Sequence, residues 1–220
     1  MNLFSEELKS HTAAAHEHAE QAGFVTELLA GRMDSSQVAA MLLQNVVIYR
    51  SLESAVGANQ DPRLKAFVDP ALLRVPALES DLAVHYGDDW ESRVSSGELH
   101  VTPGAKAYAD QLDALGPGSA TYLMAHHYVR YLGDLSGGQI ISALVQRHYG
   151  LSPEGLTFYV FDGIGKIKPY KDSYRRHVDE AAFSDSEKQE ILRHAVVAFE
   201  TNRQVFVDLM AHYVQESSRL

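Results

Sequence analysis

The chain has 220 residues, of which 45% are hydrophobic and 22% are charged, a composition typical of a soluble globular protein and unlike that of a disordered or fibrous one. It contains no cysteine, which excludes disulfides, thiolate metal sites, iron–sulfur clusters and cysteine nucleophiles. The formal net charge of −10 argues against extended binding to nucleic acid, because phosphates are neutralised by a basic face.

No basic stretch followed by an apolar run opens the chain, and apolar runs such as 46–48 are far shorter than a membrane span. We therefore expect neither a secretory signal nor a transmembrane helix, and we expect a cytoplasmic protein. A single domain over residues 1–220 is predicted, because no linker or internal repeat divides the chain. The 11 histidines are the first compositional hint of chemistry.

Helix signals begin near the N-terminus. Ser5, followed by two glutamates, predicts an N-cap. Small residues at a helical period extend this helix to Ala22. Asp34 and Gln37 match a capping box at the start of a long helix that reaches Leu52.

Three further helix starts combine a capping side chain with proline at the first helical position. They are Asp61-Pro62, Asp69-Pro70 and Thr102-Pro103. Between them, the periodicity predicts a helix over 77–86 that ends at Gly87.

The second half of the chain contains the two longest predicted helices. One follows Ser119 and ends at Gly150, and the other begins at the capping box of Ser184 and Glu187. The only strand candidate, 156–161, is short and isolated, so we interpret it as a crossing between helices. These signals predict an all-α protein.

The helix after Ser119 contains an unusual run of glycines. Gly133, Gly137 and Gly138 fall within six residues, although each costs up to about 1 kcal/mol relative to alanine. The first two share a helix face, which leaves bare backbone and favours a kink. Close packing of another helix explains the glycines equally well. Asp134, beside them, is a weak helix former, and its presence favours a functional site. The alternative, that Asp134 is a solvated surface charge, stays open at this point.

The first helix provides a second candidate. His16 has small neighbours at Ala15 and Ala19, and Glu20 lies one turn later, within reach of the imidazole. A metal-binding histidine has this pattern, because one ring nitrogen binds the metal while the other donates to a carboxylate. A plain surface hydrogen bond is the commoner explanation of such a pair. Lys9 lies two turns before His16, where it can reach an anionic group.

Together these segments resemble the haem oxygenase family, in particular its soluble bacterial, biliverdin-producing members. The strongest match is 128–139, with its Gly-Asp-Leu-Ser-Gly-Gly core, which resembles the distal helix of the family. The segment 16–24 resembles the proximal helix, and the similarity runs from about Leu8 to Leu209. Weaker matches occur in the same order and spacing at 49–53, 158–161, 171–175 and 199–206.

The resemblance implies a single-domain multi-helix bundle in which haem lies between a proximal helix and a kinked distal helix. It implies that His16 is the axial ligand of the iron and that Glu20 orients it. It also implies that Gly133 and Gly137 lie against the distal haem face, and that Asp134 holds a water network there. The other residues it implies are Lys9, Tyr128, Gly138, Lys171 and Arg175 in contact with haem or its propionates, Tyr49 and Arg130 in the distal polar network, and Phe199 and Asn202 behind that network.

The activity implied is oxidation of haem to biliverdin, in its alpha isomer, with release of carbon monoxide and ferrous iron. Dioxygen and electrons from a ferredoxin or a flavoprotein reductase would be consumed, and haem b would be both cofactor and substrate. The sequence departs from some relatives at Val25 and Val129, which would tune the pocket. The remaining histidines are interpreted as core or surface residues.

A basic cluster stands out in this acidic chain. It consists of Lys166, Lys168, Lys171, Arg175 and Arg176. Such a cluster is usually a solvated face. The two haem carboxylates would need cations as partners, and the same cluster suits the docking of an acidic electron donor.

Two other functions fit part of the pattern. A haem-storing or haem-trafficking protein would need the histidine and the cations but not Asp134 with its glycines. A non-haem di-iron oxygenase on a helical bundle gives no reason for the glycines. Its ligands would be the pairs His16/Glu20, Asp81/His85 and Glu190/His194.

Overall fold

The computed structural model describes residues 3–218, so the two residues at each end of the predicted domain 1–220 lie outside the described residues. Within that range every regular element is an α-helix or a 3₁₀-helix, which confirms the all-α prediction. The elements are α1 (Phe4–His11), α2 (Ala13–Glu20), α3 (Gly23–Leu29), α4 (Ser35–Ala58), η1 (Pro62–Phe67), η2 (Pro70–Leu72), α5 (Val75–Tyr86), α6 (Trp90–Ser95), α7 (Pro103–Leu115), η3 (Gly116–Gly118), α8 (Ala120–Tyr149), η4 (Pro153–Gly155), η5 (Thr157–Tyr159), η6 (Asp162–Ile164), α9 (Ile167–Glu180) and α10 (Asp185–Ser217).

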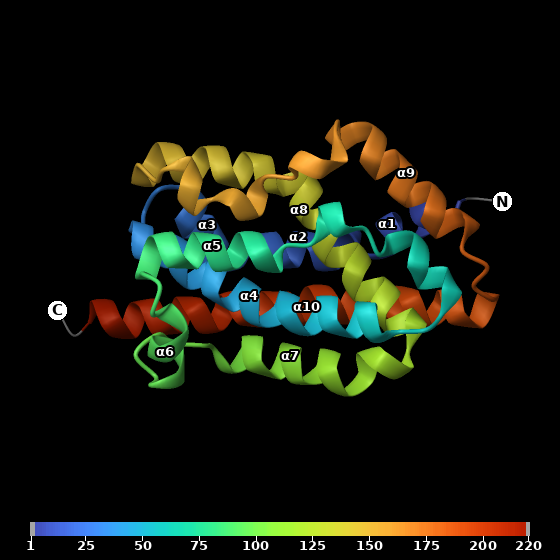
Figure 1. The fold of residues 1–220 in the computed structure, drawn as a ribbon, viewed down its shortest axis with the longest axis horizontal. Helices are drawn as coiled ribbons and strands as arrows, with labels where there is room; N and C mark the ends of the chain where they lie inside the picture. Colours follow the sequence, from blue (N-terminus) through green and yellow to red (C-terminus); the bar gives the residue numbers. More distant parts are fainter. Residues whose placement is uncertain (1–2, 219–220) are drawn as a thin grey trace.

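Two long helices organise the bundle: α8 has 30 residues and α10 has 33. α10 packs against α8, α7, α2 and α3, and α4 packs against α5 and α7 (Figure 1). The core between them is rich in aromatic rings. The largest fully buried side chains include Phe24, Tyr49, Tyr108, Tyr131 and Phe158.

The predicted boundaries of both long helices are confirmed by their caps. The hydroxyl of Ser119 accepts from the Tyr122 N–H at 3.2 Å, and Gly150 ends α8 in the left-handed conformation, with φ of 65°. At α10 the capping box is reciprocal. The N–H of Ser184 donates to the Glu187 carboxylate at 2.8 Å, and the Glu187 N–H donates back to the Ser184 hydroxyl at 3.3 Å.

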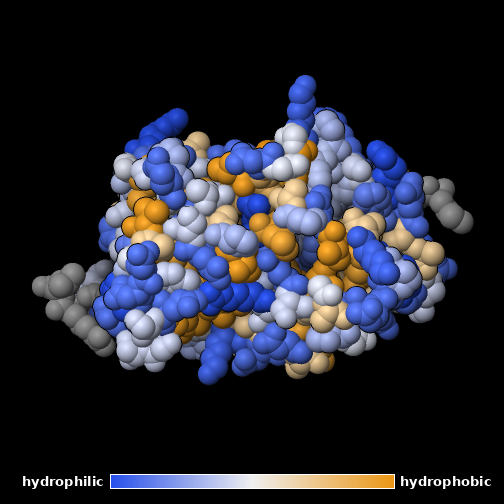
Figure 2. All heavy atoms as spheres, viewed as in Figure 1, coloured by the Kyte–Doolittle hydropathy of each residue, from blue (hydrophilic) through white to orange (hydrophobic). Residues whose placement is uncertain are grey.

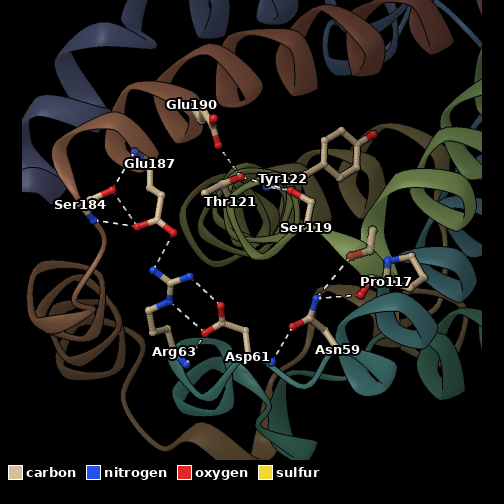
Figure 3. Close-up of polar contacts among 11 residues, drawn as sticks. Asn59, Asp61, Arg63, Pro117, Ser119, Thr121, Tyr122, Ser184, Glu187 and Glu190 are labelled. Carbon is tan, nitrogen blue, oxygen red and sulfur yellow. Dashed lines mark hydrogen bonds and ion pairs between the residues drawn. The ribbon is translucent and has the colours of Figure 1, made fainter.

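Arg63 joins the N-terminal end of α10 to the segment that follows α4 (Figure 3). Its guanidinium donates to Asp61 at 2.6 Å and to Glu187 at 2.9 Å. The side chain of Asn59 donates to the carbonyl of Pro117 at 3.2 Å, just before α8. These contacts fix the starts of α8 and α10 relative to the end of α4.

The single N-terminal helix predicted from Ser5 to Ala22 is wrong, because the chain forms two helices there, α1 and α2, and Ala22 is the residue that precedes α3. The break between α1 and α2 falls at Thr12, whose hydroxyl donates to the Leu8 carbonyl at 2.8 Å, a contact that bends helices. Ser5 is not the N-cap either. Its N–H and hydroxyl donate to Asp179 of α9 at 2.7 and 2.9 Å, so a distant carboxylate caps α1.

The glycine segment lies where α8 changes direction. In Figure 1 the helix first crosses the molecule diagonally and then turns along the top edge. The α-helix is continuous from Ala120 to Tyr149, so it bends without being interrupted. This confirms the predicted kink, for which a Gly/Ser cluster is a known cause.

The polar surface of the molecule agrees with its composition. In the view of Figure 2, apolar side chains lie in small groups among polar ones. Among residues 3–218, no helix combines the length and the apolar character that crossing a bilayer requires.

The buried pair His126 and His127 predicts a pH dependence of stability. Both are almost inaccessible, at 0% and 4% exposure, and burial is the main cause that lowers each imidazole pKa from 6.5 to about 3. Between pH 6.5 and about pH 3 these imidazoles are therefore protonated in the unfolded chain but not in the folded chain. For each of the two rings, the free energy of unfolding falls by about 1.4 kcal/mol per pH unit as the pH drops below about 6.5.

We expect the free energy of unfolding, measured with urea on the ligand-free protein, to fall from pH 7 to pH 5. Carboxyls whose pKa burial raises, such as Asp81 and Glu53, act with the opposite sign and reduce this fall. His127→Gln should flatten the slope, whereas His11→Gln, at an exposed position, should leave it unchanged. Equal slopes in all three proteins would show that His127 does not titrate in this way.

Candidate functional site

A deep cleft opens between α2 and α8, with α10 along one side. It consists of two adjoining cavities of about 380 and 260 Å³ that share His16, Val129, Gly133, Ser136 and Phe199. Most of the predicted site residues line one cavity or the other. They are Lys9, His16, Glu20, Tyr128, Arg130, Gly133, Asp134, Gly137, Gly138, Arg175, Phe199 and Asn202.

His16 lies on the α2 wall of the cleft. Its Nδ1 is 3.5 Å from the Glu20 carboxylate, and the side chains are 50% and 67% exposed. This is an electrostatic contact slightly longer than a good hydrogen bond. The ring of Phe199, on α10, stands edge-on at 5.4 Å and limits rotation of the imidazole. Because Nδ1 faces Glu20, Nε2 is the nitrogen left for a metal.

The opposite wall is the bent part of α8. A Cβ placed on Gly133 would meet nothing within 4 Å, and one on Gly137 would meet only the end of Ile141, at 4.0 Å. These glycines are therefore not explained by a helix packed against them, which removes the packing alternative. Gly138 differs, because its Cβ would lie 3.1 Å from the ring of Tyr159. It lets the loop after α8 approach closely.

Asp134 sits beside this strip and is only partly buried. Tyr49, from α4, donates a short hydrogen bond to its carboxylate. Burial raises the pKa of the Asp134 carboxyl, while the charge of Arg130 and the Tyr49 hydrogen bond act in the opposite direction. A group bound in the cleft would remove more water and raise the pKa further. The carboxyl is thus suited to hold a proton.

Arg130 ties three helices together behind this carboxylate. Its guanidinium donates to Asn202 of α10 and, at 2.8 Å, to Asn45 of α4, and it lies over the Tyr49 ring at 4.8 Å. The arginine is only 7% exposed. The predicted network of Tyr49, Arg130 and Asn202 is therefore present, and Asn45 is a member that the sequence did not reveal. Its only signal is an amide among the apolar residues of α4.

The third wall is the η5 turn, which places Phe158 and Tyr159 at the cleft. Asp81, fully buried on α5, holds this turn. Its two oxygens accept from the N–H of Thr157 and the N–H of Phe158, both at 2.8 Å, and from the Thr157 hydroxyl at 2.6 Å. Sequence reasoning placed Asp81 only in a metal pair. An aspartate at an apolar phase of α5 was the signal for this buried role.

Cations gather at the open end of the cleft. Lys9 and Arg175 line the smaller cavity together with Tyr128. Lys171 does not line it but lies one helical turn before Arg175 on α9. Burial lowers the pKa of the Lys171 amine, and the neighbouring positive charges of Arg175 and Lys9 lower it further. Three cations from α1 and α9 therefore meet at this rim, and a bound anion would relieve their repulsion.

The di-iron alternative finds no ligand set. Within residues 3–218 no group of three or more His, Asp or Glu side chains is placed to hold a metal ion. Asp81 is occupied by the η5 turn, and Nε2 of His85 lies 2.9 Å from the Gly155 carbonyl. Asp81 and His85 therefore do not face further ligands on a neighbouring helix, as a di-iron centre would require.

Comparison with known proteins agrees with this geometry. Residues 2–208 match the protein-family model described as Heme oxygenase. A heme oxygenase of Pyropia yezoensis is 33% identical over 211 residues, which cover 95% of this chain and 87% of that protein. The chain belongs to the haem oxygenase family. The resemblance seen in the sequence is thereby confirmed.

Solved structures of haem oxygenases have the same fold. The structure of heme oxygenase-1 from Synechocystis in complex with heme superposes with a TM-score of 0.90 at 28% identity, over 99% of this chain and 96% of that one. Heme oxygenase from Leptospira interrogans gives 0.85 at 30% identity, over 94% and 99%. Members of this family degrade haem, so the chain is an enzyme, and its expected haem oxygenase-like bundle is confirmed.

Proposed function

We propose that this haem oxygenase binds haem b in the cleft with His16 on the iron, and that it oxidises haem to the alpha isomer of biliverdin, carbon monoxide and ferrous iron. One observation carries the proposal. A histidine with an orienting carboxylate faces a strip of side-chain-free backbone across a single cleft, from α2 to α8. Such a cleft fits a flat, wide ligand with a metal at its centre, because the histidine can bind the metal while the bare backbone lies against the opposite face.

The residues present suit haem at both ends of the cleft. Haem is apolar over most of its surface and has two carboxylates on one edge. The inner cavity includes the apolar side chains of Val25, Met41 and Phe206. The outer rim has Lys9 and Arg175. Cations at the rim pair with carboxylates, and the open backbone at Gly133 lets the ring lie close to α8.

Bound haem would supply an iron that takes up dioxygen and activates it with electrons. The protein would contribute a neutral imidazole, which, unlike a thiolate, gives little push toward cleavage of the O–O bond. Asp134 would deliver protons through ordered water, held in place by Tyr49 and Arg130. The bend at Gly133 and Gly137 would direct the oxidation to one edge of the ring. The same region must therefore set the bilin isomer.

The test is addition of haemin and a reducing system to the purified protein. We expect a Soret band on binding, followed by carbon monoxide release and a bilin that chromatography identifies as the alpha isomer. A Soret band without bilin in a single turnover would support a haem-storing or trafficking protein. Another single isomer would contradict the alpha assignment, and a mixture of isomers would contradict the proposed role of the α8 bend.

The electron donor would be an acidic ferredoxin or flavoprotein in the cytoplasm. Lys166, the residue just before α9, and Lys168 and Arg176 on α9 are exposed and extend the cationic rim outward. Charges at the edge of an interface mainly change the association rate and its salt dependence. These three residues are separate from the proposed haem contacts, so they test docking alone.

The double variant Lys166→Glu/Arg176→Glu should slow haem reduction by a ferredoxin by about 10-fold at low salt and by much less at high salt. Stopped-flow reduction over a range of ionic strength measures this. Lys106→Glu, exposed on α7 at the opposite side of the bundle (Figure 1), is the control and should change little. If the two proteins respond alike, α9 is not the docking face.

A further inference from the structure

Three buried tyrosines lead away from the cleft wall, and each faces a proton acceptor. Tyr49 donates to Asp134, and Tyr131 donates to Glu53 at 3.0 Å. The Tyr174 oxygen lies 2.8 Å from Nδ1 of His127. In the imidazole tautomer with its proton on Nε2, the phenol donates to Nδ1.

The rings of these residues form a continuous series. Tyr49 and Tyr131 have centroids 5.4 Å apart, Tyr131 and His127 are 4.2 Å apart, and His127 stacks on Tyr174 at 5.8 Å. The tyrosines are 0%, 2% and 3% exposed. The series starts behind Asp134 at the cleft, passes through α8 and ends on α9, the helix that carries the cationic surface.

We propose that Tyr49, Tyr131 and Tyr174 form a relay that carries single oxidising equivalents out of the cleft to α9. The inference rests on the proposed function, because it needs an oxygen-activating reaction in the cleft. When that chemistry ends without product, it leaves a strong one-electron oxidant beside Asp134. A relay would remove the oxidising equivalent before it damages the walls of the cleft.

Each step balances through the paired acceptors. Tyr49 gives one electron to the oxidant and its phenolic proton to Asp134, which leaves a neutral tyrosyl radical. Tyr131 then gives an electron to that radical and its proton to Glu53, while Asp134 returns the first proton. Tyr174 then gives an electron to the Tyr131 radical and its proton to His127, while Glu53 returns the proton to Tyr131. A one-electron reductant in solution, such as ascorbate, restores Tyr174.

The pairing distinguishes these residues from an ordinary aromatic core. An oxidised phenol is a far stronger acid than a neutral one, so a fixed acceptor takes the proton as the electron leaves and keeps the positive charge off the ring. Asp134 and Glu53 are neutralised by this proton, whereas His127 becomes a short-lived imidazolium that returns its proton when Tyr174 is reduced. Tyr122 shows the contrast, because it is also buried but its hydroxyl has no hydrogen-bond partner. It makes a matched control of the same residue type on the same helix.

The test uses haem-loaded protein treated with one equivalent of hydrogen peroxide in the absence of reductant. Freeze-quenched electron paramagnetic resonance of protein with ring-deuterated tyrosine identifies tyrosyl radicals. Comparison with the spectra of Tyr→Phe variants assigns each radical to a residue, because the hyperfine splitting depends on the fixed orientation of each buried ring. We expect the radical at Tyr174 in the unsubstituted protein. Tyr131→Phe should lose the Tyr174 spectrum and retain that of Tyr49. Tyr122→Phe should match the unsubstituted protein.

Tyr131→Phe is a mild change, since Glu53 still accepts from the N–H of Arg74 and the N–H of Val75. Tyr174→Phe is a second variant and should move the radical back to Tyr131. If Tyr131→Phe binds haem and forms biliverdin normally but still shows the Tyr174 radical, the relay is disproved and the proposed function stands. If haem does not bind in the cleft, both fail.

Discussion

Replacement of Asp134 by alanine is expected to leave haem binding intact and to abolish most biliverdin formation. The variant removes the only carboxylate that lies on the cleft wall beside the glycine strip of α8 among residues 3–218. Loss of a positioned proton donor typically reduces a rate by about 10²–10⁴-fold. The single-turnover yield of biliverdin, followed by absorbance after haemin is reduced under oxygen, measures the effect.

Tyr49→Phe is the graded control for this variant. It keeps the carboxylate but removes the hydrogen bond that lowers the Asp134 pKa. The pKa should then rise, so that the carboxyl keeps its proton to a higher pH and the alkaline limb of the rate profile moves upward. A smaller loss of rate together with this shift would separate proton delivery from simple packing. Normal turnover in Asp134→Ala would remove Asp134 from the mechanism.

The local parts of this fold could be predicted from the sequence. Ser119, Gly150 and the Ser184/Glu187 capping box mark helix ends through contacts within a few residues, and all of them are confirmed. The break at Thr12 depends on a local competition between the hydroxyl and the helix that composition does not decide. The cap from Asp179 could not be predicted, because it comes from a residue 174 positions away.

The candidate site divides in the same way. Spacing within a single helix was enough to predict that Gly133 and Gly137 share one face and that Glu20 lies within reach of His16. By contrast, the contact of Tyr49 with Asp134 joins residues 85 positions apart and was not predicted. The family resemblance implied only that Tyr49 belongs to the distal polar network. Arg130 shows how the pieces meet, since Asn45 and Asn202 receive its hydrogen bonds from two other helices.

The role of Asp81 shows what residue patterns miss. Its spacing from His85 matched a metal pair, yet the carboxylate is fully buried and accepts three hydrogen bonds from the η5 turn. A buried polar group is stabilised by whichever donors surround it. Those donors lie on a loop 76 positions later. Only the tertiary structure shows that this aspartate supports the cleft.

His16→Ala is expected to weaken haem binding without preventing it. The apolar walls and the cations Lys9 and Arg175 would still hold the ring, but the iron would lack its protein ligand. Electronic absorption and resonance Raman spectra of the ferrous complex should therefore lose the signature of iron–imidazole coordination. Added imidazole should restore it.

Two controls assign the ligand among neighbouring groups. His18→Ala should retain the unsubstituted spectrum, because this imidazole is on another face of α2, 3.0 Å from Glu200 of α10. Glu20→Gln should keep the iron–histidine bond but shift its stretching frequency, and substitutions of such orienting groups reduce metal affinity by about 10–100-fold. An unchanged spectrum in His16→Ala, or a changed one in His18→Ala, would show that a different residue binds the iron. The proposed orientation of haem in the cleft would then be wrong as well.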